Sequence, residues 1–361
     1  MSAHRALLAA LIASGSGVPI DSFARGGPDP QQGAPVAAQL PVEGELPSLG
    51  GATLWLHSQP LTREALRGKV VLVQFGTYTC TYWRRTLPYI RAWAEKYASQ
   101  GLVVLVVHTP EFEFERDLDN VRRAVKEIGL DLPIAVDSDR AIWGAFKNDY
   151  WPALYAVDAQ GRVRYHHLGE GDYERSERVI QQLLAEAGHA GAGGPLVAVE
   201  GRGLEAPVDS ADLSSPETYL GYGRAERFVA RGGARRDEQH RYAAPARLGL
   251  NEWALEGEWA VREHAAAAGE PGGRVVYRFH ARDVNLIMGP ARRGTSVPFR
   301  VLIDGRPPGP AQGLDVDDQG RGTVTEQRTY QLIRQPRPIV DRTFEIEFLG
   351  PGVEAFDFTF G

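Results

Sequence analysis

The first half of the chain, from about Leu46 to Gly188, alternates uninterrupted apolar runs with segments whose apolar residues recur every three or four positions. Short uninterrupted apolar runs are typical of buried strands, and apolar residues at every third or fourth position are typical of helices with one buried face. The order of these segments predicts a mixed β-sheet with helices on both faces. We expect strands at 52–56, 70–75, 102–107, 133–136, 153–157 and 163–167, and helices after Thr62, after Cys80 and at 117–128, 140–147 and 176–187.

The second half of the chain follows a different period. Apolar residues alternate with polar or small ones at 297–303, 344–348 and 356–360, and turn sequences separate these runs. A period of two between turns predicts an all-β antiparallel sandwich. We therefore expect an α/β domain at 46–188 and a β-sandwich domain at 215–361, with a linker at 189–214 and a tail at 1–45.

Composition narrows the class of protein further. The chain has 361 residues, of which 43% are hydrophobic and 24% charged, as expected of a soluble globular protein with two domains. Its formal net charge of −6 makes nucleic acid an unexpected partner. No apolar run reaches the roughly 18 residues of a membrane span. The short apolar run Ala6–Ala13, behind His4 and Arg5, is either a secretory signal or part of a frayed tail.

The chemistry centres on Cys80, which is the only cysteine of the chain. A lone cysteine excludes an intramolecular disulfide and a zinc site built from several thiolates. Cys80 lies between an apolar strand and the start of a helix, where free N–H groups and the helix dipole favour a thiolate. We expect either a reactive nucleophile or, alternatively, a buried and inert cysteine.

Seven segments share a family resemblance: residues 75–89, 108–112, 150–153, 165–171, 216–222, 277–283 and 341–361. They resemble the DipZ-type redoxins, which are extracytoplasmic thioredoxin-like proteins related to the TlpA and ResA thiol reductases of cytochrome c maturation. The resemblance implies a thioredoxin-like fold, thiol–disulfide oxidoreductase activity without a cofactor, and a sandwich similar to carbohydrate-binding modules. It also implies a periplasmic or secreted location, a thiol- or disulfide-bearing protein or small thiol as partner, and a membrane electron donor, because a membrane domain usually precedes the redoxin.

Two positions depart from the family motif, which is C-x-x-C preceded by a tryptophan four residues before the first cysteine. The second cysteine position holds Trp83, and the tryptophan position holds Gly76. Since a dithiol reductase needs its second thiolate to release product, we expect Cys80 to form only mixed disulfides or a sulfenic acid. Trp83 lies on the buried face of the helix, so its ring is expected behind Cys80. A large side chain at position 83 and a small one at position 76, the reverse of the family motif, would conserve the volume of the core.

The resemblance also assigns residues around the thiol. Pro152 matches the cis-proline that faces the active-site cysteine, so the Trp151–Pro152 bond is expected to be cis, with the adjacent backbone holding the substrate. Glu111 follows a strand end on the same side of the sheet. It is either the acceptor of the thiol proton or a solvated loop carboxylate like its neighbours Glu113 and Glu115.

Two other functions remain open from the sequence. The spacing from Thr77 to Cys80 matches the T-x-x-C segment of peroxiredoxins, in which the threonine hydroxyl and an arginine, here Arg84, orient a peroxide. A one-cysteine peroxidase would need an external thiol to reduce its oxidised Cys80. Alternatively, the chain is an inactive redoxin scaffold that binds a protein or a glycan.

The sandwich domain offers two weaker sites. Trp253 and Trp259 are candidates for a sugar-binding platform, with Tyr277 and Phe279 beside them, although such residues are more often sandwich core. The segment 315–326 has the spacing of a calcium loop, although an ordinary acidic turn is the favoured interpretation and no metal is expected. The calcium ligands would be Asp315, Asp317, Gln319 and Glu326.

Overall fold

The computed structural model describes residues 39–361, so the apolar run at residues 6–13 lies outside the described residues. Its N-terminal sheet has seven strands in the order β1-β7-β6-β3-β4-β5-β2. Strands β3, β4 and β5 are parallel, and the hairpin β6–β7 runs antiparallel beside β3. The strands are β1 (Gly44–Glu45), β2 (Leu54–Leu56), β3 (Val70–Gly76), β4 (Leu102–His108), β5 (Ile134–Val136), β6 (Ala153–Val157) and β7 (Arg162–Leu168).

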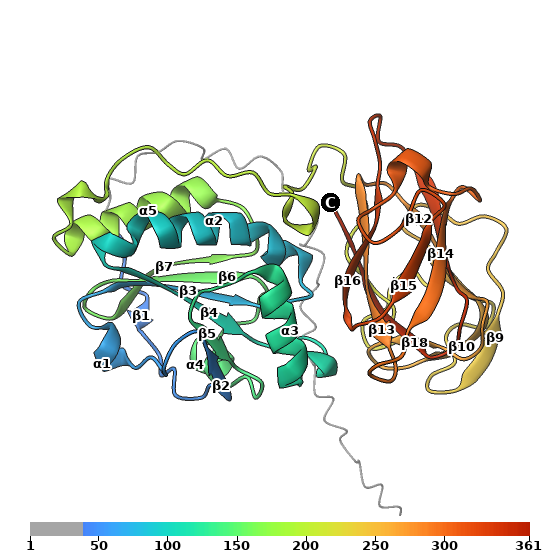
Figure 1. The fold of residues 1–361 in the computed structure, drawn as a ribbon, viewed down its shortest axis with the longest axis horizontal. Coiled ribbons are helices and arrows are strands. Elements are labelled where there is room, and N and C mark those ends of the chain that lie inside the picture. The colour runs from blue at the N-terminus through green and yellow to red at the C-terminus, as the bar shows by residue number, and fades with distance from the viewer. Residues whose placement is uncertain (1–38) are drawn as a thin grey trace, which may run out of the picture.

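Helices cover both faces of this sheet, as the sequence predicts (Figure 1). Alternate residues of β3 and β4 point to opposite faces, so one set packs on three helices and the other on two. The first face carries α2 (Thr81–Tyr97), α3 (Leu118–Ile128) and α5 (Tyr173–Glu186), and the second carries α1 (Arg63–Leu66) and α4 (Ala141–Ala145). None of the helices in residues 39–361 is long and apolar enough to cross a membrane.

The N-terminal domain includes residues slightly before the expected boundary. The two-residue strand β1 pairs with β7, and the Arg164 guanidinium donates to the carbonyl oxygens of Leu40 and Pro41 at 2.7 and 3.1 Å. These residues were expected in a tail, because a two-residue edge strand carries no hydrophobic period.

The C-terminal half is the expected antiparallel sandwich. Its two layers are connected through strand β10, which contributes to both. Strand β10 pairs with β12 through Trp253–Glu256 and with β9 from Gly257 onward, where the backbone φ of Gly257 is 90°. The strands are β8 (Thr218–Tyr219), β9 (Gln239–Tyr242), β10 (Trp253–Val261), β11 (Ala266–Ala268), β12 (Gly273–Phe279), β13 (Asp283–Pro290), β14 (Val297–Ile303), β15 (Arg321–Val324), β16 (Arg328–Arg334), β17 (Arg342–Phe348) and β18 (Val353–Phe360).

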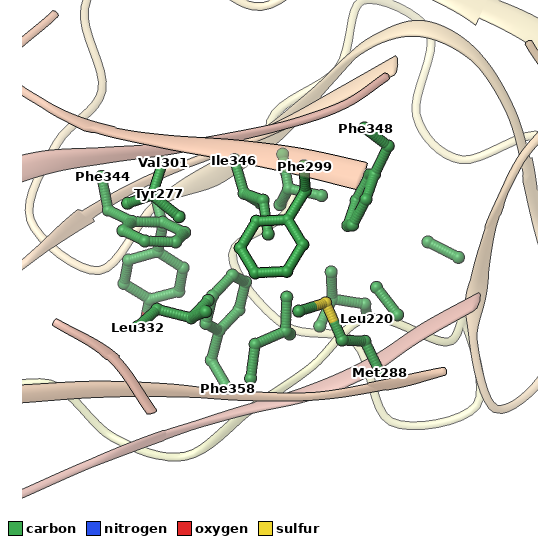
Figure 2. Packing of buried hydrophobic residues seen from close by; sticks show 14 of the residues in the cluster. Leu220, Tyr277, Met288, Phe299, Val301, Leu332, Phe344, Ile346, Phe348 and Phe358 are labelled. Carbon is green, nitrogen blue, oxygen red and sulfur yellow. The ribbon is translucent and has the colours of Figure 1, made fainter. Parts of the chain in front are cut away.

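The sandwich core lies between these two layers. Figure 2 shows Phe299, Phe344 and Phe348 pointing from one layer toward Phe358 and Leu332 of the other. Trp253 and Trp259 belong to the same core and are 0% exposed. The interpretation of these two tryptophans as a sugar-binding platform is therefore wrong, because a buried ring has no free face for a ligand.

A β-bulge turns one aromatic residue out of this core. The pairing of β13 with β18 shifts between Ile287 and Met288, so that Phe356 is left as the extra residue. Phe358 lies in the sandwich core, whereas Phe356 packs outward against Phe112 of the N-terminal domain. The sequence alternation had placed both rings on one face.

The outer face of β13, β16 and β18 covers the start of α2 (Figure 1). The hydroxyl of Thr329 donates to the Thr79 carbonyl oxygen at 2.5 Å, and the hydroxyls of Thr81 and Thr359 lie 2.7 Å apart. The Arg85 guanidinium donates to the Phe360 carbonyl oxygen at 2.8 Å. Because all of these polar groups are buried and paired, the two domains are joined by a specific contact at the cysteine-bearing helix end.

The segment between α5 and β8 runs across α5 and α2 to reach the sandwich (Figure 1). The Val197 N–H donates to Glu177 of α5 at 2.8 Å. The Arg91 guanidinium of α2 forms an ion pair with the Glu205 carboxylate at 2.8 Å. These contacts hold the segment on the helices beside Cys80.

Candidate active site around Cys80

Cys80 is the residue that precedes the first turn of α2. A turn from Thr77 ends β3 and places Cys80 at the helix N-terminus, where its Sγ accepts the Trp83 N–H at 3.4 Å. The side chain is 6% exposed. The sequence therefore predicts the position of the thiol in the fold correctly.

The protonation of the thiol differs from the expectation. The Trp83 N–H favours the thiolate, but burial raises the pKa of Cys80 well above its ordinary value, and Glu217 and Glu111 raise it further. The thiol is buried in a cluster of the N-terminal domain that includes Trp83 and Leu87. The sandwich bonds to the residues on either side of Cys80, Thr79 and Thr81. Burial thus opposes the helix dipole, which the sequence predicts to favour a thiolate, and shifts the balance toward the neutral thiol.

Trp83 occupies the space that the glycine at position 76 leaves free. A Cβ atom built on Gly76 would lie 2.1 Å from Cδ1 and 2.4 Å from Cγ of the Trp83 ring. The ring is 2% exposed, and its Nε1 is a buried nitrogen without a hydrogen-bond partner. The expected exchange of bulk between positions 76 and 83 is confirmed.

A cavity of about 590 Å³ opens beside Cys80 and is walled by three parts of the chain. The N-terminal domain contributes Tyr82 and Pro152, the connecting segment contributes 199–213, and the sandwich contributes Pro216 and Glu217. The Trp151–Pro152 peptide bond is cis, as expected. Trp151 also lines the cavity and donates its indole N–H to the Thr109 carbonyl oxygen at 2.9 Å.

Glu111 lines this cavity but is tied to the sandwich domain. Its Oε1 accepts the Tyr219 hydroxyl at 2.8 Å and the Arg224 guanidinium at 2.6 Å. The same guanidinium lies 3.4 Å from the centroid of the Tyr219 ring. Glu111 is thus neither a solvated carboxylate nor a free base, because it is held in an ion pair.

Glu115 was expected in solvent beside Glu113, yet it is 0% exposed. It accepts the Thr79 hydroxyl at 2.5 Å and the N–H groups of Glu111 and Phe112 at 2.6 and 2.9 Å. Burial nevertheless raises its pKa to about 7. The side chain fixes the loop that carries Glu111, so the interpretation of Glu115 as a solvated carboxylate is wrong.

Sequence reasoning missed a pair of carboxyl groups that the sandwich brings to the site. Glu217 lines the cavity, and its carboxyl group is hydrogen-bonded to that of Asp357 on β18. Desolvation raises the pKa of Glu217 to about 7 and that of Asp357 well above its ordinary value. Two adjacent carboxyl groups of this kind share a proton. The available signal was the segment 216–222, which resembles the redoxin family.

The two residues proposed for peroxide binding do not line the cavity. The Thr77 hydroxyl lies 3.3 Å from Nε2 of His108 and is 0% exposed, and Arg84 pairs with Glu205 at 3.7 Å. The arginines that do line the cavity are Arg85 and Arg224, and neither was considered from the sequence.

The three carboxylates of the segment with calcium-loop spacing each bond to other groups. Asp315 pairs with Arg328 at 2.6 Å, whereas Glu326 pairs with Arg123 of α3 at 3.0 Å. Asp317 accepts the N–H groups of Gln319 and Arg321. Within residues 39–361, no three His, Cys, Asp or Glu side chains are grouped to hold a metal ion. The calcium-loop interpretation is therefore not supported.

Comparisons with known proteins agree with this architecture. The AhpC/TSA family model matches residues 45–166, and the model of the thioredoxin-like C-terminal domain matches residues 215–361. The protein DipZ of Mycobacterium tuberculosis is 33% identical over 337 residues, which are 90% of this chain and 44% of DipZ. This chain therefore spans less than half the length of that relative.

Two further similarities concern the N-terminal domain. The thiol-disulfide oxidoreductase YkuV of Bacillus subtilis is 34% identical over 142 residues, which are 39% of this chain and 95% of YkuV. A solution structure of a thioredoxin-like protein in the oxidised form is 33% identical and covers 40% of this chain and 96% of its own, with a TM-score of 0.37.

Proposed function

Because this chain belongs to the DipZ-type thioredoxin-like redoxins, we propose that it carries out thiol–disulfide exchange as a monothiol through Cys80. One observation carries the proposal: the only sulfur nucleophile of the chain lies at a helix N-terminus, beside cis-Pro152 and at the wall of a cavity. Every disulfide that Cys80 forms is therefore intermolecular.

The reaction consists of two exchanges. In the first, the Cys80 thiolate attacks one sulfur of a bound disulfide, so that a mixed disulfide forms and the other half leaves as a thiol. In the second, an external thiol attacks the mixed disulfide and regenerates Cys80. Trp83 occupies the position from which a second cysteine would resolve the intermediate, so the external thiol is required.

Glu217 is the best placed group to accept the Cys80 proton. Its pKa of about 7 suits proton transfer near neutral pH, and it lines the same cavity as the thiol. Glu111, the candidate from the sequence, is less available because its Oε1 already accepts the Tyr219 hydroxyl and the Arg224 guanidinium. We assign Glu111 to holding Arg224 and Tyr219 in the cavity wall.

Neither alternative function gains support from a specific contact. A peroxidase would need the Thr77 hydroxyl and Arg84 at the thiol, but these groups bond elsewhere. An inactive scaffold would not need an open cavity beside Cys80. An extracytoplasmic location and a membrane electron donor remain proposals that rest on the family resemblance, and cell fractionation tests the first of them.

Native protein incubated with hydroxyethyl disulfide is expected to gain one hydroxyethylthio group at Cys80. The rate should still be rising above pH 9, because burial raises the pKa of Cys80 above that of a free thiol near 8.5. Intact-mass spectrometry follows the reaction, and dithiothreitol should reverse it.

The control is Cys80→Ser, which should gain no mass, and urea-unfolded protein supplies the rate of an unburied thiol. A folded protein whose thiol reacts only after unfolding would contradict the proposed function and favour the inactive scaffold. A rate that levels off below pH 8 would contradict the assigned protonation state.

A further inference from the structure

The cavity beside Cys80 has the size of a small-molecule site. Its volume of about 590 Å³ lies within the range of roughly 300–1,000 Å³ that is usual for such sites. The helix end that carries Cys80 is bonded to the sandwich through Thr79 and Thr81, and Cys80 itself is 6% exposed. A folded protein disulfide would have to separate the two domains to reach the sulfur.

The walls of the cavity carry two carboxyl groups, Asp149 and Glu217, that have no ion pair with an arginine or lysine among the described residues, whereas Glu111, Glu170 and Glu205 are paired with Arg224, Arg85 and Arg91. Five carboxyl side chains and two guanidinium groups line it. Both guanidinium groups are already neutralised, since Arg85 pairs with Glu170 at 2.7 Å and Arg224 with Glu111 at 2.6 Å. Among the described residues, Glu217 has no ion pair with a lysine or arginine within 4 Å, and its neighbour Asp357 leaves a buried Oδ1 without a hydrogen-bond partner.

Aromatic rings form much of the remaining wall. Five tyrosines and Trp151 line the cavity. Tyr89 and Tyr173 stack with their centroids 3.7 Å apart, and Arg224 lies 3.4 Å from the centroid of the Tyr219 ring. Since ring faces attract cations, the wall already holds one cation on an aromatic face beside a carboxylate.

Building on the proposed monothiol exchange, we infer that the ligand of this cavity is a small disulfide or thiol that carries an amine. Its sulfur meets Cys80 while its ammonium group lies by Glu217 and the aromatic wall. An anionic disulfide of the same size is disfavoured, because the carboxyl groups repel it and both arginines are engaged.

The charge of such a ligand also promotes the reaction. Glu217 and Glu111 both raise the pKa of Cys80, so an ammonium group placed beside Glu217 opposes their effect and favours the thiolate. The charged and titratable groups that act on Glu217 are Glu111, Arg224, Tyr219 and Asp357. An ammonium among them lowers the pKa of the carboxyl pair, so binding releases a proton and strengthens as the pH rises through 7.

The exchange balances without any further reactant. The Cys80 thiol gives its proton to Glu217, its sulfur forms a bond with one ligand sulfur, and the bond between the two ligand sulfurs breaks. The departing half takes up a proton and leaves as an aminothiol. Cys80 is oxidised to the mixed disulfide while that half of the ligand is reduced.

Three disulfides of similar size and different charge test the inference on the full chain. Cystamine is dicationic, hydroxyethyl disulfide is neutral and dithiodipropionate is dianionic; the probe reaction is formation of the mixed disulfide at pH 7.5, followed by intact mass. Each rate is divided by the rate with urea-unfolded protein, which removes the intrinsic reactivity of the reagent. We expect cystamine to exceed the neutral reagent by about tenfold and dithiodipropionate to fall below it.

Glu217→Gln should reduce the preference for cystamine to a few-fold, whereas Glu95→Gln, an exposed glutamate on α2, should leave it intact. Equal corrected rates for the three reagents, or a faster reaction with insulin than with cystamine, would overturn the inference and leave monothiol exchange standing. No reaction with any reagent in the folded protein would overturn the proposed function and the inference with it.

Discussion

Gly76→Trp is expected to destabilise this protein strongly, and the additional change Trp83→Cys is expected to recover much of the lost stability. The ring at position 83 fills the space above Gly76, so that even a Cβ atom would lie 2.1 Å from it. Overpacking of this kind costs about 1–3 kcal/mol and often more. Trp83→Cys alone leaves a cavity in the core that costs about 3–5 kcal/mol.

Urea unfolding of the wild type, both single variants and the double variant measures this coupling. The double variant should be more stable than the sum of the single effects by about 3 kcal/mol. Trp93→Cys combined with Gly76→Trp is the matched control, because Trp93 is a buried tryptophan of α2 that is not among the nearest neighbours of Gly76. Additive losses in the first pair would show that the two positions do not share a space.

The double variant also tests the chemistry. With a thiol at position 83, the mixed disulfide at Cys80 should resolve within the chain, so that both halves of the ligand are released without an external thiol. Mass spectrometry would then show an intramolecular disulfide in place of the adduct. A persistent adduct in a folded double variant would mean that the site lacks other parts of a dithiol reductase.

Acidification from pH 8 to pH 6 is expected to stabilise the folded chain. Glu115 has a pKa of about 7 in the folded state and about 4.5 when unfolded, so the folded state holds a proton that the unfolded state releases. This contribution is complete below pH 4.5 and is lost as the pH rises through 7. It amounts to about 3 kcal/mol, and Glu217 and Asp357 act in the same direction. His108 opposes them below pH 6.5, because burial lowers its pKa to about 4.

Urea midpoints between pH 5.5 and pH 8 provide the measurement. The slope should correspond to an uptake of one to two protons on folding near pH 6.5. Glu115→Gln should reduce the slope by about one proton, although the variant will be less stable at pH 6 because the carboxyl group accepts three hydrogen bonds. Stability that rises from pH 6 to pH 8 would refute the assigned pKa directions.

Hydrophobic patterning was sufficient to predict both sheets, because period and composition are local properties of a segment. Patterning failed where a single extra residue in a strand changes the face to which a side chain points. The bulge at Phe356 moves that ring to the opposite face of β18, and nothing in the alternation of 356–360 marks the extra residue. Strand β1 was missed for a related reason, since two residues show no period.

The position of Cys80 could be predicted, whereas its surroundings could not. The expectation of a thiolate considered only the start of α2, whereas the burial that opposes it comes from packing against β4, β5 and α3, which lie further along the sequence. Glu115 looked like one more charged loop residue, and its burial depends on packing that the local sequence does not encode. Glu217 lies 137 positions from Cys80, and only the resemblance of its segment to the redoxin family pointed to it.

The cavity beside Cys80 belongs to no single domain, since the sandwich and the connecting segment supply much of its wall. The cysteine and the residues that select its ligand can therefore change independently. Recombination that exchanged the C-terminal half would transfer a new ligand preference to an unaltered cysteine helix. The proposed ligand preference of this chain would then depend on the β-sandwich and the connecting segment, and its reactivity on the half that carries Cys80.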